Sequence, residues 1–172
     1  MTRTRRALLA AIPHALAGMA LLRFRPAHAQ ASLPAPEFVR QVAIANMFGI
    51  ESATLARQKS SSSAIKEYAL RLAEDHAKAA SSLRRIIARR SDIALPDRPD
   101  SRRLDLLRDL GSLDGTDFDK AYTDAQRSTH RELAQLLDSY ARTGDDPELK
   151  SFAAETLPLF QSLDRKARQL AP

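Results

Sequence analysis

Apolar side chains recur every three or four residues through most of the chain after residue 35, which is the spacing of amphipathic α-helices. No stretch alternates between apolar and polar residues as a half-buried strand would, and the whole chain contains only five glycines. The pattern therefore predicts an all-α protein with four long helices and one short helix. They are expected at residues 36–58, 63–90, 102–110, 116–142 and 147–170.

The expected ends of these helices follow from residues that cap or break helices. A serine from the run at 60–63 is suited to cap the second helix, and Asp146 followed by Pro147 is suited to open the last one. Pro158 lies inside that last helix, removes one hydrogen bond and is expected to kink it. The long segment between the second and third long helices contains the short extra helix, so we expect a four-helix bundle with a crossover connection.

The first 29 residues have the three parts of an export signal peptide. A basic start is followed by an apolar run at 7–22 and by the small-residue site Ala-His-Ala at 27–29. Arg5 and Arg6 form the adjacent pair typical of twin-arginine signals, although an ordinary secretory signal also fits. The apolar run is too short for a stable membrane span. We therefore expect a periplasmic protein with a signal peptide at 1–29, a linker at 30–36 and a bundle domain at 37–172.

The net charge of +6 and the isoelectric point near 10.1 would ordinarily suggest a nucleic-acid partner. However, five of the 27 basic residues lie in residues 1–29, which contain no acid, so the rest of the chain carries 22 basic and 21 acidic residues. We therefore expect no nucleic-acid binding. The absence of cysteine excludes disulfides and thiolate metal sites, and no Gly-x-Ser-x-Gly turn supports hydrolase chemistry. No enzyme activity is expected.

Three polar residues lie on or beside the apolar stripes of the expected helices. His76 follows Leu72 by four residues, His130 lies on the shoulder of its stripe, and Glu51 lies on an inward-leaning face. Both histidines are about fifteen residues from the nearest tight connection, and Glu51 is about ten from its own. We therefore expect the three side chains to converge near the middle of the bundle, with Asp75 beside His76.

Two interpretations of these residues remain open. A carboxylate and two imidazoles can bind a divalent metal, with Asp75 as a fourth ligand or as an acceptor that fixes a histidine tautomer. Alternatively, His76 and His130 form hydrogen bonds with Asp75 or Glu51 and specify how the helices align. A di-iron oxidase is disfavoured, because the chain has no Glu-x-x-His motif.

Three segments of the chain carry a family resemblance. They read "FVRQVAIANMFGIESATLARQKSSSSAIKEYALRLAEDHAKAASSL", "FDKAYTDAQRSTHREL" and "DPELKSFAAETLP". Over about residues 37–170 the chain resembles the bacterial exported family called domain of unknown function 4142 (DUF4142). The resemblance implies a ferritin-like helical bundle, a periplasmic location and a polar set made of Glu51, Asp75, His76 and His130. It implies no activity.

One position departs from that family. The family usually has a histidine five residues after the proline of its "LP" pair, and this chain has Leu163 there. If the family's polar set is a metal site, this chain lacks one ligand. We therefore expect an exported, non-catalytic binding or stress-associated protein with a buried His/Asp/Glu cluster. The alternative is a divalent metal-binding protein that uses Glu51, His76 and His130, although the sequence requires no cofactor and identifies no ligand or partner.

Overall fold

The computed structural model describes residues 33–170, in which every regular element is a helix. The predicted signal peptide and residues 30–32 of the predicted linker lie outside the described residues. Each observed helix begins and ends within three residues of its expected range. The helices are α1 (Ala35–Lys59), α2 (Ser63–Ile87), α3 (Ser101–Gly111), α4 (Gly115–Thr143) and α5 (Pro147–Gln169).

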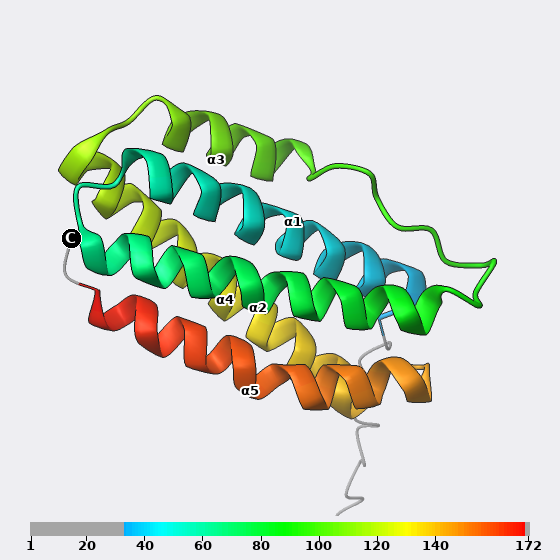
Figure 1. The fold of residues 1–172 in the computed structure, drawn as a ribbon. Coiled ribbons are helices and arrows are strands. Elements are labelled where there is room, and N and C mark those ends of the chain that lie inside the picture. Colours follow the sequence, from blue (N-terminus) through cyan, green and yellow to red (C-terminus); the bar gives the residue numbers. More distant parts are fainter. Residues whose placement is uncertain (1–32, 171–172) are drawn as a thin grey trace, which may run out of the picture. The chain divides into compact units, whose positions relative to one another are not determined.

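The four long helices form a bundle of two antiparallel pairs, α1 with α2 and α4 with α5 (Figure 1). α1 also packs against α4, and α2 against α5, so that α2 and α4 lie on one diagonal of the bundle. The segment from 88 to 111, including α3, carries the chain back along the bundle, and α4 begins near the end where α1 stops (Figure 1). The predicted four-helix bundle with a crossover and a short extra helix is therefore confirmed.

Side-chain caps open two of the helices as expected. Ser62 accepts a hydrogen bond from the backbone N–H of Ile65 at the start of α2, and Asp146 accepts one from Leu149 at the start of α5. α4 begins differently, because Gly115 adopts a φ of 60° that L side chains rarely adopt. α5 continues as one helix through Pro158, which lies on an exposed face.

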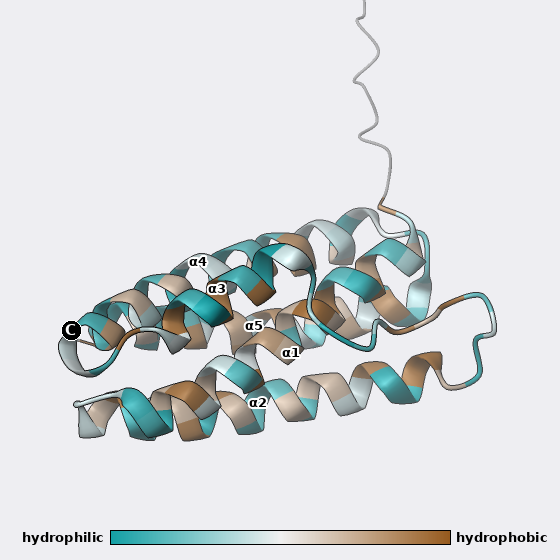
Figure 2. Cartoon of the chain, turned by 90° about the horizontal axis from the view of Figure 1, so that it is seen from above, coloured by the Kyte–Doolittle hydropathy of each residue, from teal (hydrophilic) through white to brown (hydrophobic). Residues whose placement is uncertain are grey.

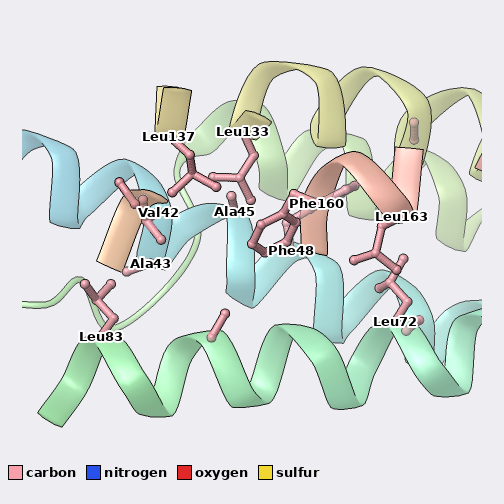
Figure 3. Close-up of a cluster of buried hydrophobic side chains, with 14 of the residues drawn as sticks. Val42, Ala43, Ala45, Phe48, Leu72, Leu83, Leu133, Leu137, Phe160 and Leu163 are labelled. Carbon is pink, nitrogen blue, oxygen red and sulfur yellow. The ribbon is translucent and has the colours of Figure 1, made fainter. Parts of the chain in front are cut away.

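The core is formed by the inward stripes of all four long helices, as the close-up in Figure 3 shows for Val42, Leu83, Leu137 and Phe160 among others. Figure 2 shows hydrophobic and hydrophilic colours alternating along the helices, as expected of amphipathic elements. At one end of the core the rings of Phe38 and Tyr140 are stacked, with centroids 3.8 Å apart. Such burial of apolar surface is the main driving force for helix association.

α3 is attached to the bundle by the buried side chain of Arg103. Its guanidinium lies over the ring of Phe48 in α1, 5.4 Å from the centroid, and forms an ion pair with Glu132 of α4 at 3.0 Å. These two contacts hold the crossover segment against α1 and α4. Within the described residues, no helix is long and apolar enough to cross a membrane.

We expect Asp146→Ala to lower the free energy of unfolding by about 1–2 kcal/mol, because it removes the cap of α5. Asp146 also accepts a hydrogen bond from Arg90, which lies just after α2, and that contact is lost as well. Urea denaturation followed by circular dichroism measures the loss. Glu148→Ala is the matched control, since Glu148 is an exposed first-turn carboxylate without a cap bond. Equal losses in the two variants would contradict the assigned role of Asp146.

Candidate functional site

Two histidines meet in the middle of the bundle. His76 of α2 and His130 of α4 have no exposed surface, and their Nε2 atoms lie 3.3 Å apart. Because α2 and α4 are on a diagonal, this contact crosses the centre of the core. The ring of Phe160 from α5 packs against both imidazoles, with centroids 5.0 Å and 6.1 Å away.

The outer nitrogen of each imidazole meets a polar atom from the protein. His76 Nδ1 lies 3.0 Å from Oδ1 of Asn46 in α1, and His130 Nδ1 lies 3.4 Å from Oη of Tyr68 in α2. Tyr68 Oη also lies 3.3 Å from the backbone oxygen of Leu163 in α5. A chain of polar atoms therefore joins all four long helices through the core.

The lack of a side chain at Gly49 leaves room for the ring of His76. This glycine is in α1, one turn after Asn46, and a Cβ atom built on it would lie 2.5 Å from the imidazole. Carbon atoms do not approach so closely without displacement, so either the ring or the helix would have to move. Only glycine lets α1 lie this near to the histidine.

Burial keeps both imidazoles neutral near pH 7. It lowers the pKa of His76 well below the ordinary value of 6.5, and the neighbouring His130 lowers that pKa further. Burial also lowers the pKa of His130 to about 4, although the Asp164 carboxylate opposes part of that shift. A neutral imidazole has one N–H donor and one nitrogen lone pair, so each ring can both donate and accept.

The acceptor to which the Tyr68 hydroxyl donates determines which ring nitrogen of His130 is protonated. His76 donates from Nδ1 to Asn46 Oδ1, which leaves a lone pair on its Nε2. If Tyr68 donates to His130 Nδ1, then His130 carries its proton on Nε2 and donates it to His76. If Tyr68 donates to the Leu163 carbonyl, His130 is protonated on Nδ1 and two Nε2 lone pairs face each other. The second arrangement is stable only with a cation or an added proton between the rings.

The two carboxylates of the predicted set do not lie at the histidine pair. Glu51 is exposed, because it follows Asn46 by five residues and therefore points about 140° away from it around α1. Asp75 is half-buried, and its carboxylate lies 3.7 Å from Nζ of Lys78. Over residues 33–170, no group of three or more His, Cys, Asp and Glu side chains is arranged to hold a metal ion. The predicted four-residue site is thus not assembled there.

The sequence prediction missed three residues that shape the site, namely Asn46, Gly49 and Tyr68. Asn46 and Gly49 follow Val42 by four and seven residues, so they continue the apolar stripe of α1. A glycine inside such a stripe is a known sign of close packing, and it could have indicated a neighbour of unusual proximity. Tyr68 precedes Leu72 by four residues, on the same stripe as His76.

The fold and the site together define the class of this protein. It is a four-helix bundle with a pair of neutral histidines buried in its core. The family model described as "Domain of unknown function (DUF4142)" matches residues 23–170, and the chain belongs to this family. The resemblance inferred from the sequence is therefore confirmed. No curated protein matches the chain.

A solved structure of CopM in its Cu(II)-bound form is similar to this chain, with a TM-score of 0.67. The two sequences are 12% identical, and the match covers 80% of this chain and 95% of that one. At this level of identity the likeness concerns the helical fold alone. It agrees with the all-α bundle described above.

We expect Gly49→Ala to destabilise the protein by about 1–3 kcal/mol, because the added methyl group overpacks against His76. The loss should appear although alanine is a better helix former than glycine by about 1 kcal/mol. Gly111→Ala is the matched control, since nothing lies within 4 Å of a Cβ at that position. Thermal unfolding should show a lowered Tm for Gly49→Ala alone. Equal Tm values in both variants would contradict the close approach.

Stability should fall as the pH drops from about 6.5 towards 4. Both folded-state pKa values are lowered, so the unfolded chain binds protons that the folded protein excludes, and acid favours unfolding. For His130, a shift from 6.5 to about 4 corresponds to roughly 3 kcal/mol. Urea denaturation at half-unit pH steps measures the slope.

The control for this pH series is the double variant His76→Leu/His130→Leu. It should show a flat profile between pH 6.5 and 4.5, because carboxylates with lowered pKa values such as Glu37 release their stabilisation at more acidic pH. An equally steep fall in the double variant would assign the acid sensitivity to other groups.

Proposed function

We propose that the protein is a non-catalytic binding protein of the periplasm, in which the histidine pair chiefly fixes the alignment of the helices. The observation that carries this proposal is that His76 and His130 are fully buried and hydrogen-bonded to each other and to protein groups at both ends. Buried polar groups satisfied in this way favour one packing arrangement over others. The predicted export signal supports the location.

The burial of both rings also argues against catalysis at this site. A catalytic base must come within about 3 Å of the atom from which it takes a proton, and neither ring has surface that a substrate could reach. An oxidase site in a helical bundle needs several carboxylates at the metals. Glu51 and Asp75, the acids predicted for a metal site or for hydrogen bonds with the histidines, lie away from the pair.

A second candidate function, the binding of a divalent metal, is favoured by one distance. Two nitrogen ligands of a tetrahedral metal at 2.0–2.1 Å are separated by about 3.3 Å, which matches the separation of the two Nε2 atoms. Asn46 Oδ1 and Tyr68 Oη are placed to accept from the Nδ1–H groups, as outer partners of metal-bound histidines do. The similar fold of CopM, whose structure holds Cu(II), agrees with this candidate.

The ligand count favours the first proposal over the second. Structural zinc sites use four protein ligands, and catalytic ones use three. Here two imidazoles face each other, and the position where the family has a further histidine is occupied by the buried Leu163. A metal held by His76 and His130 alone would need water or the phenol of Tyr68 to complete its coordination.

Metal analysis of the purified protein separates the two candidates. We expect less than one metal ion per chain and a Tm that does not respond to added Cu(II), Zn(II) or Mn(II). Stoichiometric metal that is lost in His76→Leu and in His130→Leu would overturn the first proposal in favour of the second. Glu51→Gln and Asp75→Asn are the matched controls, and their metal content should equal that of the unchanged protein. Circular dichroism of each variant verifies that the bundle is folded.

A further inference from the structure

A pocket lies where the start of α3 meets α1 and α4. Its volume is about 200 Å³, and it is partly open to solvent. Much of its apolar wall comes from Ile44 of α1 and from Leu133 and Leu136 of α4. Neither histidine of the buried pair lines it. The pocket is therefore a site distinct from the centre of the bundle.

The buried guanidinium of Arg103 holds one polar side of this pocket in place. It donates to Thr129 Oγ1 at 3.2 Å and to Glu132 Oε2 at 3.0 Å. The Glu132 carboxylate also accepts two hydrogen bonds from Arg102, so two guanidinium groups share it. Groups that are already fixed in this way lose little conformational freedom when a ligand binds beside them.

Arg40 and Asp100 also line the pocket, and both are exposed. Within residues 33–170 they form no ion pair with each other. Asp100 Oδ1 accepts from the backbone N–H of Arg103, and Arg40 donates to Glu37 through Nε and Nη2, which leaves its Nη1 available. The hydrogen bonds to Glu37 raise the pKa of Arg40, and the Asp100 carboxylate raises it further through its charge. The two opposite charges at the pocket thus influence each other without direct contact.

The balance of charge around the pocket selects the kind of ligand. Three guanidinium groups and three carboxylates line the pocket or are bonded to a lining residue, and they are Arg40, Arg102, Arg103, Glu37, Asp100 and Glu132. Because these charges cancel, a ligand with a net charge gains little from the set as a whole. A zwitterion can use Arg40 and Asp100 at the same time.

The size and the apolar wall of the pocket restrict the ligand further. A buried cavity of about 150 Å³ holds benzene, which has six heavy atoms. A volume of about 200 Å³ therefore suits about eight heavy atoms. Valine and leucine have this size, and each combines a carboxylate and an ammonium group with a branched alkyl side chain.

We propose that this pocket binds an aliphatic α-amino acid of the size of valine or leucine. The ligand carboxylate accepts hydrogen bonds from Arg40, and the ligand ammonium donates to the Asp100 carboxylate. The alkyl side chain contacts Ile44, Leu133 and Leu136. The inference rests on the proposed binding function and names its ligand class, but it does not involve the histidine pair at which a metal would bind.

Nuclear magnetic resonance of the full, folded protein at pH 7 tests this proposal with L-leucine as the probe. We expect saturable shifts of the backbone amides of Ala45 and Leu133, which line the pocket, with a Kd of about 1 mM because ion pairs in contact with water are weak. 4-Methylpentanoate is leucine without the ammonium group, and 3-methylbutylamine is leucine without the carboxylate. Each should bind at least about fivefold more weakly than leucine.

Two pairs of matched variants identify the groups that bind. Arg40→Gln should weaken leucine binding several-fold and leave the affinity for 3-methylbutylamine unchanged, because that amine lacks the group that Arg40 binds. Arg57→Gln is its control, since Arg57 is exposed on the same helix and does not line the pocket. Asp100→Asn should also weaken leucine binding while keeping the cap of α3, because asparagine caps a helix as well as aspartate does. Asp105→Asn is the control for this change, as an exposed position of α3 outside the pocket.

Three outcomes would overturn the amino-acid proposal. They are no saturable shift with leucine, equal binding of leucine and either analogue, and equal effects of a variant and its control. Metal content is measured separately on the same samples. Stoichiometric metal together with leucine binding would overturn the structural role of the histidine pair and leave the pocket proposal intact. A metal-free protein that does not bind leucine would overturn the pocket proposal alone.

Discussion

The contact between His76 and His130 crosses the buried core of the bundle, and it constrains the positions of all four long helices. A pair of Nε2 atoms 3.3 Å apart tolerates little movement of α2 against α4. The outer nitrogens of the two rings extend this constraint to the other two helices. His76 is hydrogen-bonded to Asn46 of α1, and His130 is hydrogen-bonded to Tyr68, which is in turn hydrogen-bonded to the backbone of α5. An apolar core of similar volume would pack as densely but would specify this alignment less strictly.

The two Nε2 atoms could either hydrogen-bond to each other or coordinate a metal, and both roles require neutral rings. Burial holds both imidazoles neutral, which is the state required for mutual hydrogen bonding and also for metal coordination. Metal coordination differs from mutual hydrogen bonding in that it requires further ligands. In this chain the ring of Phe160 packs against both imidazoles, and Leu163 occupies the position of the further family histidine. The Asp164 carboxylate acts on His130 through its charge, but it forms an ion pair with Arg168. The site is thus better equipped to order the core than to retain an ion.

Asn46 links α1 to the histidine pair, because its Oδ1 accepts a hydrogen bond from Nδ1 of His76. The other end of the amide, Nδ2, is buried and has no hydrogen-bond partner among the described residues. The orientation of this amide is therefore set by the imidazole, which requires an acceptor at its Nδ1–H.

The helical pattern determined the fold class, the helix ranges to within three residues, a serine cap in the run at 60–63 and the cap at Asp146, because these depend on neighbours along the chain. It also indicated that His76 and His130 lie in the core. Which partners they meet was decided only by tertiary packing, since one residue turns a side chain by about 100° around a helix. That rotation left Glu51 exposed and brought Asn46 to the imidazole instead, through a close approach that Gly49 permits.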